Sequence, residues 1–513
     1  MPEQQTRPLS WRLRKRFWDR LAIAKFKGNK PIRIPVPTRK QRVVEPVSLA
    51  SMYPGVPVSD IRVADHVPDD EASRLKRRFV AFQVGLYSRY SPMQAGLPSV
   101  ATDPIAVLEE AYTGKHRECF PAPERPEELN GPDRPELGVM AVCGPFACYL
   151  EKAPAGHYEW DLRELSEYEH HPGLQRLGVR VLFDVDEANR SLRATRIESA
   201  LGTHRPGDAQ WPAARKIALC TASTHVSLVR HFNWVHLACG GPLAIATRNR
   251  LPHDHPLCRL LWPHVFGTQY SNDVITEAHM LEVGEFPAIF SLAHAGMCEL
   301  ISRSFSDYRI SVVDPQADAE RRGIANGGFD TPSQDNLQRL FDVMRAHAER
   351  YVAHYYETDD AIRQDHGVRA WLDELERLIP NGIRESLRGK VSRASVARLV
   401  AGFIYAVSVQ HEVLGTGMWN YQLWTDKIPV RVYVDGSREP LDVYQRLVNA
   451  NFNLNVRRAQ LMRDFAYLAP DDGGRRLCLQ FLSELRALNA QLRSQLPAPW
   501  RICPDMLEAN MNA

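Results

Sequence analysis

The segment ASVARLVAGFIYAVSVQHEVL, residues 394–414, is apolar on nearly every side of a helix. A surface helix has one polar face, whereas a helix that is apolar all round is buried in a large core. No uninterrupted apolar run in the chain reaches the roughly 20 residues that a membrane-spanning helix needs. The segment therefore predicts a central helix enclosed by other helices.

A second apolar segment contains HFNWVH, in which His231 and His236 are five positions apart. Neighbours on one face of an α-helix are three or four positions apart, so a regular helix would point these two rings in different directions. A π-turn brings residues i and i+5 into line and often marks a functional site. Gly240, Gly241 and Pro242 follow directly and favour a distorted helix, because proline removes a backbone donor. Together with His411 in the first segment, the pair predicts three neutral imidazoles around iron, zinc, copper or nickel.

The remaining pattern predicts a mainly α fold. Residues 337–356 and 368–379 repeat apolar side chains at spacings of three and four, and the chain is mostly helical in pattern from about Trp211 onward. Residues 139–150 and 179–198 have strand-like apolar runs, the second with a turn at Glu187 to Ser191. We therefore expect one large helical domain with a small β element near residues 138–200.

Composition narrows the class of protein. With 64 basic and 61 acidic residues in 513, the chain has no charge excess that would indicate nucleic-acid binding. Nine cysteines without a Cys-x-x-Cys pair favour neither a disulfide framework nor a zinc ribbon. The N-terminus lacks the apolar core of a signal peptide, so we expect a cytoplasmic protein.

Residues 10–30 are rich in Arg and Lys with aromatic side chains between them. Such a segment either lies as an amphipathic helix on an anionic membrane surface or packs its aromatic side onto the main body. The sequence leaves both alternatives open.

The residues after His231 resemble the iron-binding segment of lipoxygenases. The matching landmarks are His231, His236, Ala246, Thr247, Leu251, His255, Pro256, Leu261, Pro263 and His264. Residues 339–375 are similar to the family's helix before the second metal segment. AVSVQHEVLGTG resembles the segment with the third iron histidine, and CPDMLEANMNA resembles the family's last residues. The resemblance runs from about residue 50 to the C-terminus, so residues 1–50 are expected to be a basic extension and 51–513 the catalytic domain, without the family's N-terminal β-barrel domain.

The resemblance implies a mononuclear non-haem iron held by His231, His236, His411 and the terminal carboxylate of Ala513. It implies that ferric hydroxide abstracts a hydrogen atom from an unsaturated acyl chain and that dioxygen then adds to give a hydroperoxide. It also implies that His255 and His264 are structural. His225 and His253 are left unassigned, and spacing alone excludes none of these four histidines as ligands.

Several positions depart from the family. Gly415 stands where Asn or His is a weak ligand, which leaves an open or water-filled iron position, and Glu412 has either a solvent-side or a supporting role. An ungapped match from His264 puts Asn272 on a family asparagine, Ile275 on a small residue that bears on stereochemistry, and His279 on a leucine that clamps the reactive carbon. These last two residues, with Gly415, are the expected substrate-pocket differences.

Three functional hypotheses follow. The first is a lipoxygenase-like dioxygenase of an unsaturated lipid, free or carrier-attached. The second keeps the iron but rearranges hydroperoxides or oxidises a more polar metabolite, as Gly415 and His279 favour. The third is an inactive relative that binds lipids or partners, against which the retained histidines argue.

Overall fold

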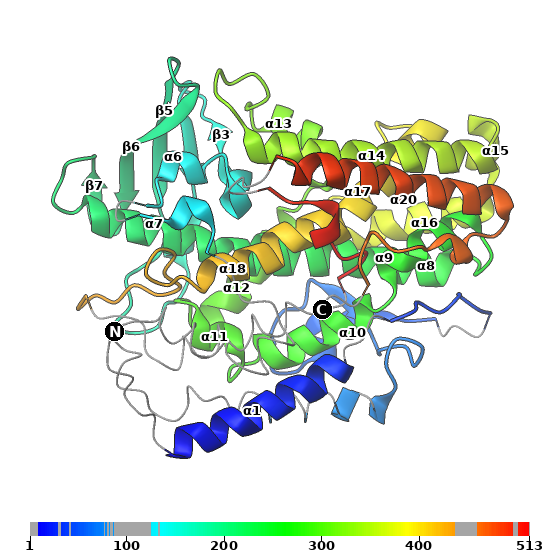
Figure 1. Cartoon of the computed structure of the whole chain (residues 1–513), viewed down its shortest axis with the longest axis horizontal. Coiled ribbons are helices and arrows are strands. Elements are labelled where there is room, and N and C mark those ends of the chain that lie inside the picture. The colour runs from blue at the N-terminus through cyan, green and yellow to red at the C-terminus, as the bar shows by residue number, and fades with distance from the viewer. Residues whose placement is uncertain are drawn as a thin grey trace.

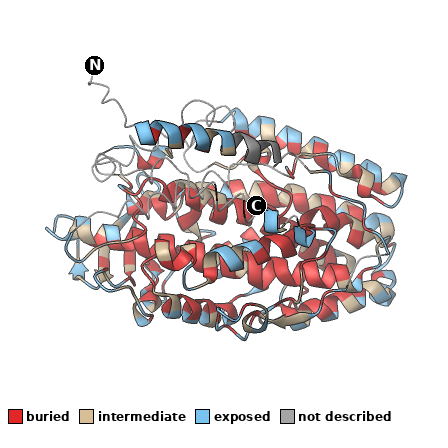
Figure 2. Cartoon of the chain, turned by 90° about the horizontal axis from the view of Figure 1, so that it is seen from below, coloured by how far each residue is buried: buried red, intermediate tan, exposed pale blue. Residues whose placement is uncertain are grey.

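Two long, buried helical segments form the centre of the molecule. The computed structural model describes residues 9–28, 32–39, 43–75, 77–79, 82, 86, 125–131, 134–436, 459–495 and 501–511. In Figure 2 the helices in the middle are almost entirely buried, while those at the rim expose one side. The predicted mainly α fold is confirmed.

The first central segment runs without a break through α7 (Trp211–His225), the π-helix η5 (Val226–Gly240) and α8 (Gly241–Arg250). The junction residues have right-handed helical dihedrals, so the chain changes pitch without leaving the helix. Pro242 lies in the first turn of α8, where its missing N–H costs little.

The second central segment is the apolar one at residues 394–414. It consists of α17 (Arg393–Tyr405), the π-helices η8 (Ala406–Gln410) and η9 (Glu412–Gly417), and α18 (Met418–Gln422). A capping box begins it, in which Ser392 accepts from the backbone N–H of Ser395 and the Ser395 side chain accepts from the backbone N–H of Ser392. The predicted buried helix is therefore present, with two π-turns in its second half.

Other helices enclose these two segments. They are α9 (Pro256–Val265), α10 (Thr268–Ile275), the π-helix η6 (Thr276–Met280), α11 (Glu285–Ile289), α12 (His294–Ser306), η7 (Ile310–Val313), α13 (Pro315–Arg321), α14 (Pro332–Tyr355), α15 (Asp359–Gln364), α16 (His366–Leu378), η10 (Ala466–Leu468), α20 (Asp472–Arg493) and η11 (Pro504–Met506). Figure 1 shows α14, α17 and α20 running side by side, and α14 contacts both of the others. No helix in the described ranges is long and apolar enough to cross a membrane.

A five-stranded antiparallel sheet stands at one end of the helical body (Figure 1). Its order is β3 (Glu151–Lys152), β4 (Tyr158–Asp161), β5 (Arg180–Asp186), β6 (Ser191–Ser199) and β7 (Gly202–His204). The predicted hairpin at residues 179–198 is confirmed, with Asp186 paired to Ser191 across its turn. Tyr158 pairs with Phe183, which fixes the register between β4 and β5.

The prediction of a strand at residues 139–150 is wrong. The chain there forms α6 (Leu137–Met140) and the 3₁₀ helix η3 (Gly144–Tyr149). Gly144 has φ +69°, a left-handed conformation that glycine adopts readily, and Pro145 then fixes the first turn of η3. The Gly-Pro pair therefore reverses the chain where an apolar run suggested extension.

The N-terminal part lies in the lower half of the molecule in Figure 1, with α1 at the lower edge. It contains α1 (Leu9–Gly28), β1 (Pro46–Ser48), α2 (Leu49–Met52) and β2 (Arg62–Ala64), and two short 3₁₀ helices, η2 (Glu127–Leu129) and η4 (Arg163–Glu167), come later in the chain. β1 and β2 pair in an antiparallel ribbon. Trp11 and Trp18 of α1 are buried in the main hydrophobic core, as the packing alternative predicted.

Candidate metal centre

The wide turns of η5 aim His231 and His236 at one point. Their Nε2 atoms are 3.2 Å apart and their ring centroids 4.9 Å apart. In a π-helix five positions are about one turn, which removes the misalignment that an α-helix would impose. The π-turn inferred from the five-residue spacing is therefore present.

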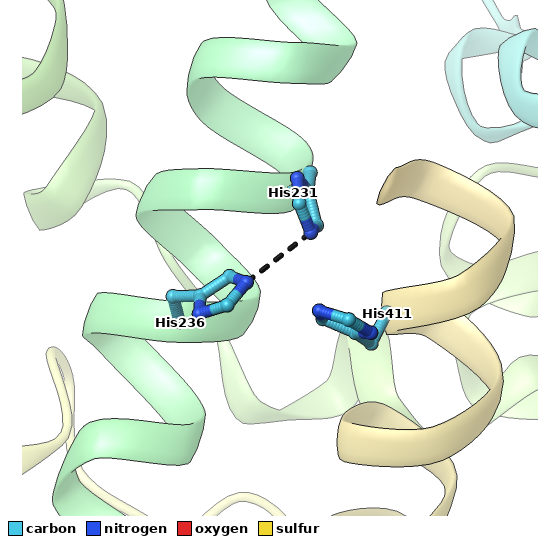
Figure 3. A group of neighbouring side chains, drawn as sticks. All are labelled: His231, His236 and His411. Atoms are coloured by element: carbon cyan, nitrogen blue, oxygen red, sulfur yellow. Dashed lines mark hydrogen bonds between the residues drawn. The ribbon is translucent and has the colours of Figure 1, made fainter. Parts of the chain in front are cut away.

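His411 reaches the same point from the second central segment. Its ring centroid lies 5.0 Å from that of His231 and 5.0 Å from that of His236. One ring nitrogen from each of the three residues lies within 4.8 Å of the other two. Figure 3 shows the three rings converging from two facing helices. This is the one group of three or more His, Cys, Asp or Glu side chains with metal-binding spacing among the described residues.

Burial keeps the imidazoles of His231 and His236 neutral. It lowers the pKa of His236 to about 3, with a further contribution from His411. Burial also sets the pKa of His231 well below its usual value, and His236 and His411 lower it further. Neutral rings present lone pairs, so these two histidines can coordinate a cation without first losing a proton.

Asn272 fixes the orientation of His236. Its Oδ1 is 2.9 Å from Nδ1 of His236, and its Nδ2 donates to the His236 carbonyl at 3.3 Å. Because an amide oxygen only accepts, His236 carries its proton on Nδ1 and directs the Nε2 lone pair at the cluster. Supporting hydrogen bonds of this kind typically orient metal-bound histidines.

Glu412 is buried next to His411, which excludes the solvent-side role. Its Oε1 lies 3.5 Å from Nδ1 of His411. Both side chains are about 5% exposed, so solvent screens the electrostatic interaction between the carboxylate and the ring only weakly.

Gly415 lies directly over His231. A Cβ atom at this position would be 2.5 Å from Nε2 of His231 and 2.8 Å from its Cε1. Such a distance is too short for any real side chain, so the His231 ring occupies the room that a residue at 415 would need. Position 415 thus faces the cluster, as its spacing from His411 indicated, but contributes no ligand.

The C-terminal segment packs against the helix that carries the histidine pair. His264 Nδ1 donates to the Ala509 carbonyl at 2.7 Å, and Asn510 donates to the Pro263 carbonyl at 2.9 Å. Met511 is fully buried, and its Cε lies 2.0 Å from where a Cβ on Gly240 would be. A side chain at 240 would have to displace the tip of this methionine. Ala513, the expected fourth ligand, lies outside the described residues.

Ile275 and His279 lie on the α10–η6 segment, outside the histidine cluster. Ile275 is partly buried against the core. The ring of His279 stacks on Phe286 with centroids 5.2 Å apart, and its Nδ1 is 3.0 Å from Oε2 of Glu285. Phe286 contacts Phe232, whose ring lies 6.0 Å from that of His236, so aromatic packing separates His279 from the cluster.

The other histidines considered as ligands have different partners. His255 accepts from the backbone N–H of Leu257 at the start of α9 and faces Asp365. His225 lies between Glu164 and the hydroxyl of Tyr149. His253 has Asp254 as its nearest carboxylate, at 3.8 Å. None of the three belongs to the cluster.

The donor set fits a first-row transition metal. Three buried imidazoles from two helical segments, with one tautomer fixed by Asn272, match what iron, zinc, copper or nickel requires. Chemistry alone does not choose among these metals, and similarity to known proteins narrows the choice.

The lipoxygenase family model matches residues 187–447, slightly more than half of the chain. The chain belongs to the lipoxygenase family. Lipoxygenases use non-haem iron, and all three clustered histidines lie inside the matched range.

The solved lipoxygenases share the fold. The structure of a coral 8R-lipoxygenase superposes with a TM-score of 0.75 at 13% identity, covering 100% of this chain and 83% of that one. A calcium-dependent 11R-lipoxygenase gives 0.72 at 14% identity, covering 96% and 80%. At such identities the likeness concerns the fold alone.

Curated relatives match over a shorter range. The mouse epidermal-type polyunsaturated fatty acid (12S)/(13S)-lipoxygenase is 27% identical over 191 residues, which are 36% of this lipoxygenase and 28% of the mouse protein. The human polyunsaturated fatty acid lipoxygenase ALOX15B is 24% identical over 193 residues, with the same two shares. These matches thus span less than a third of the relatives' length.

Proposed function

We propose that this lipoxygenase is a non-haem iron dioxygenase that converts a polyunsaturated acyl chain to a hydroperoxide. The observation that carries the proposal is the convergence of three buried imidazole nitrogens within 4.8 Å, in a chain of the lipoxygenase family. The relatives named above are polyunsaturated fatty acid lipoxygenases, which gives the substrate class.

His231, His236 and His411 would hold the iron, together with the main-chain carboxylate of Ala513. The C-terminal segment supports this fourth ligand, because Ala509 and Met511 are fixed against His264 and Gly240 beside the histidine pair. When bound, the iron would supply the oxidising power that removes a hydrogen atom from the acyl chain before dioxygen adds to it.

The residues of the chain itself have three tasks in this chemistry. Burial keeps His231 and His236 unprotonated, and Asn272 would hold the His236 lone pair toward the metal. Phe232 and Phe286 form an apolar layer beside His236, which excludes water from a reactive substrate. Gly415 leaves the face above His231 without a side chain ligand.

This last feature favours a second candidate reaction on the same iron. A centre that receives no ligand from position 415 would have one protein donor fewer, and an additional donor from the substrate, such as a hydroperoxide oxygen, could take its place. The second candidate is therefore an iron enzyme that rearranges hydroperoxides or oxidises a more polar metabolite.

Metal analysis and dioxygen uptake separate these candidates. The purified protein is analysed for iron and mixed with linoleic or arachidonic acid in an oxygen-electrode cell. Dioxygen consumption with a conjugated-diene product supports the dioxygenase. Iron with no uptake, but with loss of an added fatty-acid hydroperoxide, supports the second candidate. A protein that retains no iron after expression in iron-supplemented medium overturns both.

A further inference from the structure

The helix α1 has two opposite faces with different chemistry. Trp11, Lys15 and Trp18 are turned into the protein, and Trp18 is fully buried. Within this buried face Lys15 pairs with Asp19 at 2.5 Å. The helix is thus attached to the body by its tryptophan side, and its other side carries exposed residues.

The outward face carries large apolar side chains. Leu9, Leu13 and Phe17 are 64%, 56% and 40% exposed. A spacing of four advances a side chain by only about 40° around a helix, so the three form one stripe. Isolated exposed apolar residues are ordinary, but a continuous stripe on one helix face typically marks an interaction surface.

Guanidinium groups lie beside this stripe. Arg12, Arg16 and Arg20 are exposed and also follow one another at intervals of four. Their positions on the helix fall next to and between those of Leu9 and Leu13. Figure 2 shows this face of α1 exposed at the rim of the molecule.

We propose that this face of α1 docks on a bilayer that contains anionic lipids, with the apolar stripe inserted at the interface and the three arginines on the lipid phosphates. Interfacial helices combine these two features, apolar burial and attraction of Lys and Arg to anionic headgroups. The tryptophans are already committed to the protein core, so docking would leave the body intact. The proposal concerns location at a surface and does not depend on the iron chemistry.

The test is co-sedimentation of the full chain with vesicles. We expect binding to phosphatidylcholine vesicles that contain phosphatidylserine, little binding to phosphatidylcholine alone, and weakening with added salt. The combined change Arg12→Gln, Arg16→Gln and Arg20→Gln should reduce binding about a hundred-fold, since each basic residue near an anionic surface strengthens binding about five-fold. Leu9→Gln with Leu13→Gln should also reduce it, because the stripe is the inserted part.

Arginines on α20 provide the matched control. Arg475, Arg476 and Arg486 are exposed on a helix in the upper half of Figure 1, while α1 lies at its lower edge. Their combined change to Gln alters the net charge equally and should leave vesicle binding unchanged. Equal losses in the two triple variants overturn the proposal, as does binding that depends on the arginines but not on Leu9 and Leu13. Preferential binding of duplex DNA over vesicles overturns it in favour of a nucleic-acid surface. Both triple variants should keep iron and dioxygen uptake, so this result is independent of the proposed reaction.

Discussion

The Cβ position of Gly415 lies 2.5 Å from Nε2 of His231. A residue on one central helix therefore limits where a ring on the other can stand. The His231 ring can lie where it does only because residue 415 has no side chain, so a side chain added at 415 must displace the ring.

Gly415→Ala should lower iron retention without unfolding the protein. The added methyl must displace the tip of His231, while alanine in a helix is more favourable than glycine by up to about 1 kcal/mol. We expect less iron per chain by metal analysis and a metal-free melting temperature that is unchanged or raised. Gly417→Ala is the control, because its Cβ would meet only the Glu412 carbonyl, at 3.2 Å. Full iron occupancy in Gly415→Ala would show that the ring moves without consequence.

His411→Ala should abolish metal retention, because two imidazoles on one helix cannot enclose an ion. Iron should fall from about one per chain to near zero after gel filtration. His347→Ala is the matched control, since His347 is equally buried but stacks on Phe481, away from the cluster. A fully loaded His411→Ala protein would refute the assignment of His411 as a ligand.

Asn272→Ala should weaken iron binding by about 10- to 100-fold, the usual effect of losing a partner that orients a metal-bound histidine. His236 Nδ1 would lose its acceptor, and the tautomer that presents Nε2 would no longer be favoured. Competition with a chelator measures the affinity. Asn249→Ala removes a similar donor and acceptor pair, which binds both backbone groups of Val44, and should leave the affinity unchanged.

Adding one residue after Ala513 should reduce iron content, since the added residue would move the carboxylate away from the cluster. Metal analysis of the extended and the original chains gives the answer. The same residue added before Met1 serves as the control. Unchanged iron in the C-terminal extension would exclude the Ala513 carboxylate from the site.

Glu128 should make the protein less stable as the pH rises from about 4.5 to about 7. Burial, and then Glu127, raises the pKa of Glu128 to about 7 from an ordinary value of 4.5, and Tyr421 donates to its Oε1. The folded state thus keeps a proton that the unfolded chain releases. The contribution of Glu128 to the free energy of unfolding is therefore greatest below the unfolded-state pKa, and it is lost as the pH rises through the folded-state pKa. Glu128→Gln should raise the free energy of unfolding at pH 8 by on the order of 3 kcal/mol and should change it little at pH 4. Chemical denaturation at the two pH values tests this, with the exposed Glu127→Gln as control.

Local patterns in the sequence were sufficient to predict the central helices and the wide turn. Residues 394–414 are apolar all round, and the spacing of His231 and His236 fits only a π-turn if both rings meet one ion. The hairpin at 179–198 could also be predicted, because the pattern of its apolar residues and its turn are both local features of the sequence. At 139–150 the apolar run was misleading, since the Gly144–Pro145 pair determines the backbone there.

The supporting contacts of the site could not be predicted, because they join distant positions. Asn272 could be aligned with a family asparagine, but its hydrogen bonds to His236 depend on how α10 packs on η5. His279 was expected beside the substrate. Whether it pairs with Glu285 or faces a pocket depends on the turn after η6, which no periodic pattern describes.

The bond between His264 and Ala509 has a consequence for how the protein is made. The two residues are 245 positions apart, so the ring finds its acceptor only after residue 509 has been synthesised. His231, His236 and His411 are all available earlier, on helices that can form as they emerge. A nascent chain halted before residue 509 would therefore present three imidazoles with one wall of the site missing. Correct metal incorporation is thus expected to follow the synthesis of residue 509 and the folding of the segments before it, because domains begin to fold from their N-terminal side during translation.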